Sequence, residues 1–280
     1  MKEVTYDEIA AAVERLCIRS TTVLPPDLAI ILECACDAEP SEAGKNALYD
    51  IYKNFQVAAR EGLPICQDTG MAVVFAEVGQ DMHIKGGSFE EAVCEGVRRG
   101  YINGGLRKSV VKDPFRRVNT GDNTPPVIHT RIVPGDTLKL TVAPKGFGSE
   151  NCSAAKMFLP SDGQDSVEAF IVETVSNAGS KACPPMVVGI GLGGTIEKAA
   201  LLAKTALTRP ADARNADPFY AEMEARILTA INRLGIGPQG FGGKYTAVAV
   251  NIEVFPTHIA GLPCVVNIGC HVTRHASTVL

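Results

Sequence analysis

The sequence predicts a mixed α/β (α+β) fold, in which a helical N-terminal layer precedes a mixed β-sheet with packed helices. Three observations predict it. The first 60 residues carry apolar side chains at helical spacing, several later runs are short and rich in β-branched residues, and helix patterns alternate with those runs. Since no repeat or low-complexity linker interrupts the chain, we expect a single domain over 1–280 whose helical portion covers about 1–62.

The N-terminal layer is predicted as three helices. The second begins after Pro25 and Pro26, and Ser41 is a candidate N-cap for the third. The expected ranges are 5–19, 26–37 and 41–61.

The rest of the chain alternates strands and helices. Ser88 and Glu91 form a capping-box pattern for a helix that ends near Asn103. Pro134-Gly135 joins two β-patterned runs. Strands are expected near 71–78, 127–133, 136–144, 244–255 and 262–272, and further helices near 164–178 and 218–234. Residues 182–207 are expected to form a strand, a glycine loop and a helix.

Composition excludes several classes of protein. The net charge is -4, which gives no electrostatic reason to expect a nucleic-acid partner. The N-terminal segment is amphipathic and acidic, unlike a signal peptide. No apolar run approaches the ~20 residues that span a bilayer. We therefore expect a cytoplasmic protein with no membrane partner.

Nine cysteines remain to be explained in a reducing compartment, where disulfides are rare. Their number is odd and their spacing forms no framework, so each thiol is buried, reactive or a metal ligand. Cys17, Cys34 and Cys94 lie in helix-like stretches, where cysteine acts as a small hydrophobe. We expect these three and Cys36 to be structural.

Residues 189–194 fit the G-x-G-x-x-G pattern of dinucleotide sites. That fingerprint needs a second strand ending in an acidic residue about 20 residues later. Here the corresponding window continues a helix into a polar loop. We therefore expect no nicotinamide cofactor, and we interpret the glycines as close packing or an anion cradle.

At three other cysteines the backbone is expected to leave regular secondary structure. Cys66, Cys183 and Cys270 each have Gly or Pro nearby, so each sulfur can point into a cleft. Their separations, 117 and 87 residues, match no zinc-ribbon or ferredoxin pattern. The residues and their spacing alone therefore allow two interpretations: the three cysteines are buried structural residues, or they bind a metal together.

Several motifs together resemble one family. They are PICQDTG, KGFGSEN, ACPPMVVGIGLGGT, FGGKYTAVAV and FPTHIAG followed by VVNIGCHVTRH. In this order they resemble the alpha-type subunit, or N-terminal catalytic region, of class I iron–sulfur fumarate hydratases and L-tartrate dehydratases. The similarity covers nearly the whole chain.

The resemblance implies a 4Fe–4S cluster with three cysteine ligands and one open iron. The ligands would be Cys66, Cys183 and Cys270. Cys264 and Cys152 are the nearby competitors. The open iron would act as a Lewis acid toward a substrate hydroxyl.

The resemblance also implies the residues that meet the substrate. Gln67 and Asp68 would bind it, with Asp68 also in acid–base work, although an Asx-turn is the alternative role for Asp68. Arg107 would pair with a substrate carboxylate. Gly148 would offer a backbone amide, and His258 would bind substrate and act as a catalytic residue.

His271, Arg274 and His275 follow the last expected ligand in the sequence and could support the cluster. One departure is Ser149-Glu150-Asn151, where many relatives have Ser-Ala-Asn, so contacts in that turn are expected to differ.

The function implied by the resemblance is the alpha subunit of a hydro-lyase that acts on a small dicarboxylate. Fumarate hydratase, which interconverts fumarate and (S)-malate, is the first expectation. The alternatives are an L-tartrate dehydratase alpha subunit, which yields oxaloacetate, and a non-catalytic metal-holding subunit. A beta-type subunit would complete the active site, in a dimer of alpha–beta pairs.

Overall fold

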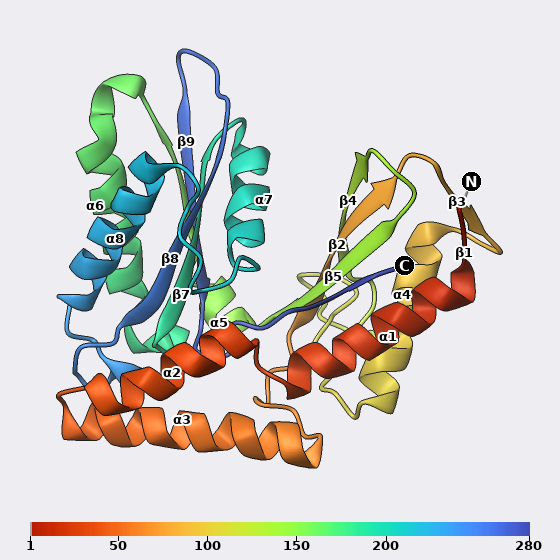
Figure 1. The fold of residues 1–280 in the computed structure, drawn as a ribbon, viewed down its shortest axis with the longest axis horizontal. Helices are drawn as coiled ribbons and strands as arrows, with labels where there is room; N and C mark the ends of the chain where they lie inside the picture. Colours follow the sequence, from red (N-terminus) through yellow and green to blue (C-terminus); the bar gives the residue numbers. More distant parts are fainter. Residues whose placement is uncertain (1) are drawn as a thin grey trace. The chain divides into compact units, whose positions relative to one another are not determined.

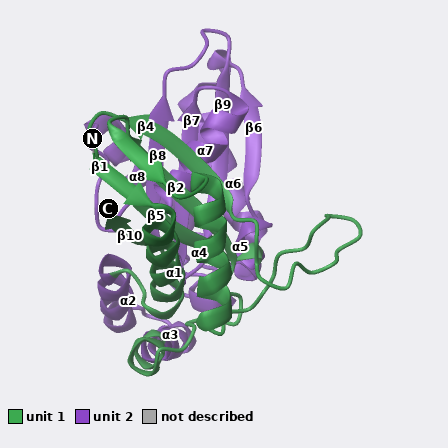
Figure 2. Cartoon of the chain, turned by 90° about the vertical axis from the view of Figure 1, so that its right-hand side faces the viewer, with its two compact units in different colours: residues 1–25, 55–147, 274–280 green, residues 26–54, 148–273 purple. Residues whose placement is uncertain are grey.

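The computed structural model describes residues 2–280 and confirms the mixed α/β fold (Figure 1). The chain divides into two compact units, coloured separately in Figure 2. Unit 1 comprises residues 1–25, 55–147 and 274–280, and unit 2 comprises residues 26–54 and 148–273. The single domain expected over 1–280 stays a prediction. No helix in the described part of the chain is both long and apolar enough to cross a bilayer.

Unit 1 is built on a four-stranded sheet in the order β10-β5-β2-β4. The central strand β2 pairs in parallel with β4 and antiparallel with β5. A second, two-stranded sheet pairs β1 with β3. The elements are β1 (Lys2–Thr5), α1 (Tyr6–Thr22), β2 (Met71–Gly79), β3 (Met82–Lys85), α4 (Phe89–Asn103), β4 (Val127–Val133), β5 (Leu138–Lys145) and β10 (Ala276–Val279).

The core of unit 1 lies where α1 and α4 meet this sheet. The two helices approach closely because α4 carries glycines at the contact. A Cβ at Gly96 would lie 2.5 Å from the Ala10 carbonyl oxygen, and one at Gly100 would lie 2.7 Å from Cys17 Cβ. The short side chains of α4 therefore bury Cys17 completely.

Unit 2 contains a second four-stranded sheet in the order β6-β9-β7-β8. Strand β7 pairs in parallel with β8 and antiparallel with β9. Helix α3 (Glu42–Glu61) continues from unit 2 into unit 1, and α5 (Phe147–Glu150) lies at the next boundary. The other elements are α2 (Pro26–Ala38), β6 (Ala154–Phe158), α6 (Gly163–Ala178), β7 (Met186–Gly193), α7 (Ile196–Ala206), α8 (Pro218–Asn232), β8 (Ala247–Phe255) and β9 (Leu262–Gly269).

The two faces of β7 explain the glycine motif. Val188 and Ile190 belong to the core formed with α6 and α8. Gly189 and Gly191 alternate with them and point toward α7, where added Cβ atoms would lie 2.3 Å and 1.9 Å from carbonyl oxygens of that helix. The glycine loop expected here was wrong, because residues 189–193 belong to β7. The two glycines allow α7 to pack closely against the sheet.

Most predicted elements occur within a few residues of their expected bounds. The Ser88 cap is present, since its side chain accepts a hydrogen bond from the Glu91 amide. The sequence did not predict which strands are hydrogen-bonded neighbours. β2 lies between β4 and β5 in its sheet, and β7 lies between β8 and β9, so the order in each sheet differs from the order in the chain. The short strands β1, β3, β6 and β10 were not predicted, because four or five residues give too short a pattern.

Candidate active site

The turn at residues 67–70, which precedes β2, is held by buried polar side chains of unit 1. The Tyr101 hydroxyl lies 2.9 Å from the carbonyl oxygens of both Thr69 and Gly70. Asn123 Nδ2 donates to the Gly70 carbonyl oxygen at 3.1 Å. Tyr101 and Asn123 are wholly buried, and burial raises the pKa of the Tyr101 hydroxyl well above its ordinary value, so this group stays a donor. The turn is therefore fixed by the fold of unit 1.

Asp68 uses both carboxylate oxygens within this turn. Its Oδ1 accepts a hydrogen bond from the Gly70 amide at 3.0 Å, which is the Asx-turn geometry. Its Oδ2 accepts one from the Phe147 amide, also at 3.0 Å. Asp68 therefore has a structural role in the turn, and it is only half-buried.

Gln67 and Arg107 are brought together on the exposed side of the same turn. Arg107 Nη1 lies 3.5 Å from Gln67 Oε1, and both side chains are exposed. The Thr69 hydroxyl donates to the Arg107 carbonyl oxygen at 3.1 Å and fixes the backbone there. An amide and a guanidinium on one exposed surface can bind a carboxylate.

Arg274 joins this group from the C-terminal segment. Its side chain is only 5% exposed, and its Nη2 donates to the Asp68 carbonyl oxygen. Its Nε is buried without a hydrogen-bond partner among residues 2–280. Arg274 thus places a buried positive charge behind the Asp68 turn.

Cys183 and Cys270 are neighbours in unit 2. Cys183 is exposed and has left-handed backbone angles, φ 52° and ψ 66°, which are uncommon for a residue with a Cβ. Its carbonyl oxygen accepts a hydrogen bond from the His271 amide at 3.1 Å, and His271 Nδ1 lies 3.0 Å from the same oxygen. Gln239 Nε2 contacts His271 Nδ1 at 3.1 Å. The backbone at Cys183 is therefore fixed beside Cys270.

Cys270 lies immediately after β9. Its carbonyl oxygen accepts hydrogen bonds from the amide and the hydroxyl of Thr273, at 2.9 and 2.8 Å. Its Sγ accepts one from the Val272 amide at 3.4 Å. Amide donors to sulfur are a known feature of iron–sulfur ligands. Cys66, the third expected ligand, lies in unit 1 beside the 67–70 turn and is half-buried.

The donor set fits an iron–sulfur group in its chemistry. All three expected ligands are thiols that lie outside helices and strands and are at least partly exposed. Across residues 2–280, no three His, Cys, Asp or Glu side chains are gathered in a geometry ready to hold a metal ion. The ligand set stays a prediction.

The competing cysteines differ in their surroundings. Cys264 is fully buried in the unit 2 core, and burial raises the pKa of its thiol to about 12. Cys152 packs partly against that core and lies 3.4 Å from the Gly148 carbonyl oxygen. A thiol with a raised pKa is a poor metal ligand because the thiolate is the binding form.

The four cysteines expected to be structural do not all share one environment. Cys17 and Cys36 are buried, Cys94 is half-buried, and burial raises the pKa of all three thiols, that of Cys17 to about 12. The expectation for Cys34 was wrong, since it is exposed. It lies on α2 beside Glu33, and the buried positions of that helix are Leu28, Leu32, Ala35 and Cys36.

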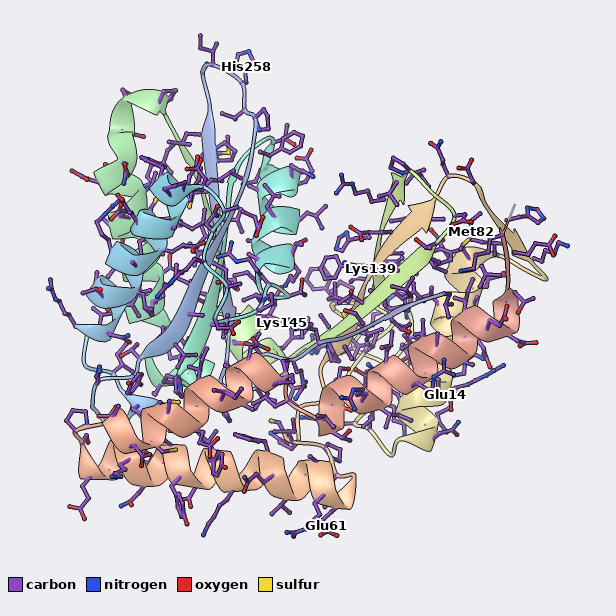
Figure 3. All side chains as sticks on the ribbon, in the orientation of Figure 1. Glu14, Glu61, Met82, Lys139, Lys145 and His258 are labelled. Atoms are coloured by element: carbon purple, nitrogen blue, oxygen red, sulfur yellow. The ribbon has the colours of Figure 1, made fainter. Side chains whose placement is uncertain are left out.

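Gly148 and His258 lie in unit 2 at different places. Gly148 is exposed within α5, and a Cβ there would lie 3.7 Å from the Lys181 carbonyl oxygen, which precedes Cys183 by two residues. Figure 3 shows His258 at the tip of the loop between β8 and β9. Its Nδ1 accepts a hydrogen bond from the Ala260 amide at 3.2 Å.

Within unit 2, His258 is not brought to the cysteine pair. It precedes β9 whereas Cys270 follows it, and eight residues of strand span about 26 Å. His258 therefore has no contact with Cys183 or Cys270 in this chain, and its catalytic role stays a prediction.

Sequence reasoning missed Tyr101 and Asn123. Tyr101 sits near the end of a helix pattern and Asn123 in a polar loop, where both look ordinary. Only the three-dimensional contacts with the 67–70 turn identify them.

The chain is similar in sequence to one protein family along almost its whole length. A family model described as Fumarate hydratase (Fumerase) matches residues 10–279. A Methanocaldococcus jannaschii chain, whose name provisionally makes it an L(+)-tartrate dehydratase subunit alpha, is 40% identical over 278 residues, which covers 96% of each chain. L(+)-tartrate dehydratase alpha subunits of Escherichia coli O157:H7 and Shigella boydii serotype 4 are 33% and 32% identical over 280 residues, covering 99% of this chain and 92% of theirs.

Proposed function

The chain belongs to the fumarate hydratase (Fumerase) family, and from this premise we propose that it is the alpha subunit of an iron–sulfur hydro-lyase, an L(+)-tartrate dehydratase. One observation carries the choice of substrate. Relatives that are 32–40% identical over almost the whole chain bear the tartrate dehydratase name. The order expected from the sequence, fumarate first and tartrate second, is therefore reversed.

The cofactor in this proposal is a 4Fe–4S cluster. Cys66, Cys183 and Cys270 would hold it, leaving one iron without a protein ligand. When bound, the cluster supplies a Lewis acid that makes a substrate hydroxyl a better leaving group. The support from this chain is the exposure of these thiols, in contrast to the core thiol Cys264.

The residues of unit 1 would bind and orient the substrate. Arg107 would pair with a carboxylate, and Gln67, 3.5 Å away, would donate or accept at a hydroxyl. Asp68 would hold or move a proton, helped by the fixed turn in which it lies. In unit 2, Gly148 would offer its amide, and His258 would contact the substrate from the β8–β9 loop.

Fumarate hydratase remains the second candidate, because the matching family is described by that activity. Tartrate carries one hydroxyl more than malate. A site that hydrogen-bonds that hydroxyl rejects the analogue lacking it, because its polar groups would be left unpaired. The two functions therefore differ by the partners available to a single hydroxyl.

A beta-type subunit would complete the active site, because the relatives are named as alpha subunits. We expect a dimer of alpha–beta pairs in the cytoplasm, where a reducing environment protects an exposed iron.

The experiment is anaerobic co-purification of this chain with a beta-type subunit of the same family from the same genome, followed by assay on L(+)-tartrate, D(−)-tartrate, (S)-malate and fumarate. We expect oxaloacetate from L(+)-tartrate at a kcat/KM at least tenfold above that for malate. Preference for malate and fumarate would restore the first expectation. Full cluster content with no turnover of any of these acids would favour the non-catalytic subunit.

A further inference from the structure

An arm of unit 1 lies beside the segment that carries Arg107, since Asn119 Nδ2 donates to the carbonyl oxygen of the adjacent Lys108 at 2.9 Å. The arm comprises residues 110–120 and forms a short antiparallel hairpin. Val111 bridges to Asn119, the Lys112 amide donates to the Val118 carbonyl oxygen at 2.8 Å, and the Thr120 amide donates to that of Val110 at 3.0 Å. These bonds give the loop a defined shape. In Figure 2 a long loop projects from unit 1 beyond α4.

The tip of the arm is built to present a phenylalanine. Asp113 Oδ1 accepts hydrogen bonds from the amides of Phe115 and Arg116, at 3.0 and 2.7 Å, and the Arg117 amide closes the turn on the Asp113 carbonyl oxygen at 3.0 Å. Phe115 is nevertheless 93% exposed, more than any other large apolar side chain in the described chain. An exposed aromatic side chain on a fixed backbone turn is the kind of group that anchors protein interfaces.

The charge of the arm is opposite to that of the chain. Lys112, Arg116 and Arg117 are exposed, whereas the one carboxylate, on Asp113, is turned inward onto the backbone amides. The whole chain has a net charge of -4. The arm is therefore a basic projection with an apolar tip. A complementary partner surface would have a hydrophobic pocket bordered by acidic residues.

The base of the arm is connected to the candidate active site. Asn123 Oδ1 accepts hydrogen bonds from the amides of Ser109 and Val110, at 2.7 and 3.1 Å, while its Nδ2 donates to Gly70 in the 67–70 turn. One buried amide thus fixes both the root of the arm and the turn that carries Asp68. A partner bound to the arm would lie next to the surface of Gln67 and Arg107.

We propose that the 110–120 arm is the docking element for the beta-type subunit, with Phe115 as its apolar anchor and Lys112 and Arg116 as its electrostatic guides. This inference rests on the proposed function, which supplies the partner. Continuity with the Arg107 surface favours that partner over a second copy of this chain, because the beta-type subunit is the one expected to complete the site. Its complementary surface would be a hydrophobic pocket bordered by Asp and Glu.

The test measures binding of purified alpha variants to the beta-type subunit without substrate, by biolayer interferometry under anaerobic conditions. The variants are Phe115→Ala and the double change Lys112→Glu with Arg116→Glu. Matched controls are Ile259→Ala, a 90% exposed apolar side chain in the β8–β9 loop, and Arg60→Glu, an exposed cation on α3. Urea unfolding and iron content of each alpha variant verify that the fold is retained.

We expect Phe115→Ala to weaken binding by about 10–100-fold, mainly through faster dissociation. The charge reversal should slow association by about tenfold at low salt, and this difference should shrink in 0.5 M salt. Both controls should stay within about twofold of the wild type, and the unfolding midpoints should not change.

Three results would overturn the proposal: unchanged binding by Phe115→Ala, an equal loss in Ile259→Ala, or an effect confined to self-association of the alpha chain. The last would identify a second copy as the occupant. Failure of the proposed function would give a different result. The wild-type complex would assemble and the arm variants would weaken binding as expected, but the complex would turn over no dicarboxylate. That result would reject the activity alone.

Discussion

The 67–70 turn of unit 1 and the Cys183–Cys270 pair of unit 2 hold their functional side chains in different ways. In the turn, buried side chains fix the backbone, and the Asp68 carboxylate itself accepts two amide hydrogen bonds. At the cysteine pair, hydrogen bonds also fix the carbonyl oxygens, but both thiols keep access to solvent. The turn is complete as a structure, whereas the cysteine pair keeps its sulfurs accessible to a further ligand.

The largest expected effect concerns the thiols. Cys66→Ser, Cys183→Ser or Cys270→Ser should each abolish the broad brown absorption of anaerobically reconstituted protein, which should bind about four irons, because each removes one of three ligands. Iron analysis and visible spectra measure this.

The matched control is Cys264→Ser, which should keep the iron because that thiol lies in the core. Loss of iron in Cys264→Ser together with full iron in Cys270→Ser would mean that the third ligand is misassigned.

The next effect tests whether the Asp68 turn is more than structural. Asp68→Asn removes the charge but keeps the shape, so kcat of the assembled enzyme should fall by ~10²-fold or more with iron retained. Its side-chain amide can no longer accept from both backbone amides without reorientation, so the unfolding midpoint must be measured as well.

Arg107→Ala is the comparison variant for Asp68→Asn. It removes a contact made in both ground and transition states, so KM should rise more than kcat falls. Near-normal kcat in Asp68→Asn would leave that residue only its Asx-turn role.

A smaller effect should follow from loosening the turn itself. Tyr101→Phe removes a buried donor from the carbonyl oxygens of Thr69 and Gly70, which should lower the free energy of unfolding by about 1–3 kcal/mol. Urea unfolding of the alpha chain measures this. Tyr52→Phe is the control, since that hydroxyl bonds an exposed glutamate on the surface. An equal change in both variants would remove the special role of Tyr101.

The smallest expected effect is the pH dependence of the core thiol. The pKa of Cys264 is about 12 when folded, above the ordinary thiol value of about 8.5. Its contribution to stability is therefore fully present below about pH 8.5 and is lost as the pH rises toward 12. Between pH 8 and 10, wild-type protein should lose about 1–2 kcal/mol more stability than Cys264→Ala, as measured by urea unfolding. Identical slopes would contradict the burial effect.

The sequence predicted local features better than long-range ones. The Asx-turn offered as an alternative role for Asp68 and the helix after Ser88 could be predicted because a few neighbouring residues determine them. The positions of β2 between β4 and β5, and of Tyr101 beneath the turn, depend on residues about 30 to 70 apart, and no local pattern records such contacts. The predicted strand over 262–272 already separated His258 from Cys270, although the family motifs assigned both residues to one active site.

The interleaving of the two units has a consequence for synthesis on the ribosome. Strand β10 pairs with β5 across more than a hundred residues, and Leu280 exchanges two backbone hydrogen bonds with Leu138. Residues 26–54 and 148–273 therefore emerge before β10, one of the two edge strands of the unit 1 sheet, exists. Until β10 arrives, β5 presents an open edge to other chains in the crowded cell. During translation, that open edge is a surface on which chaperones can protect the nascent protein.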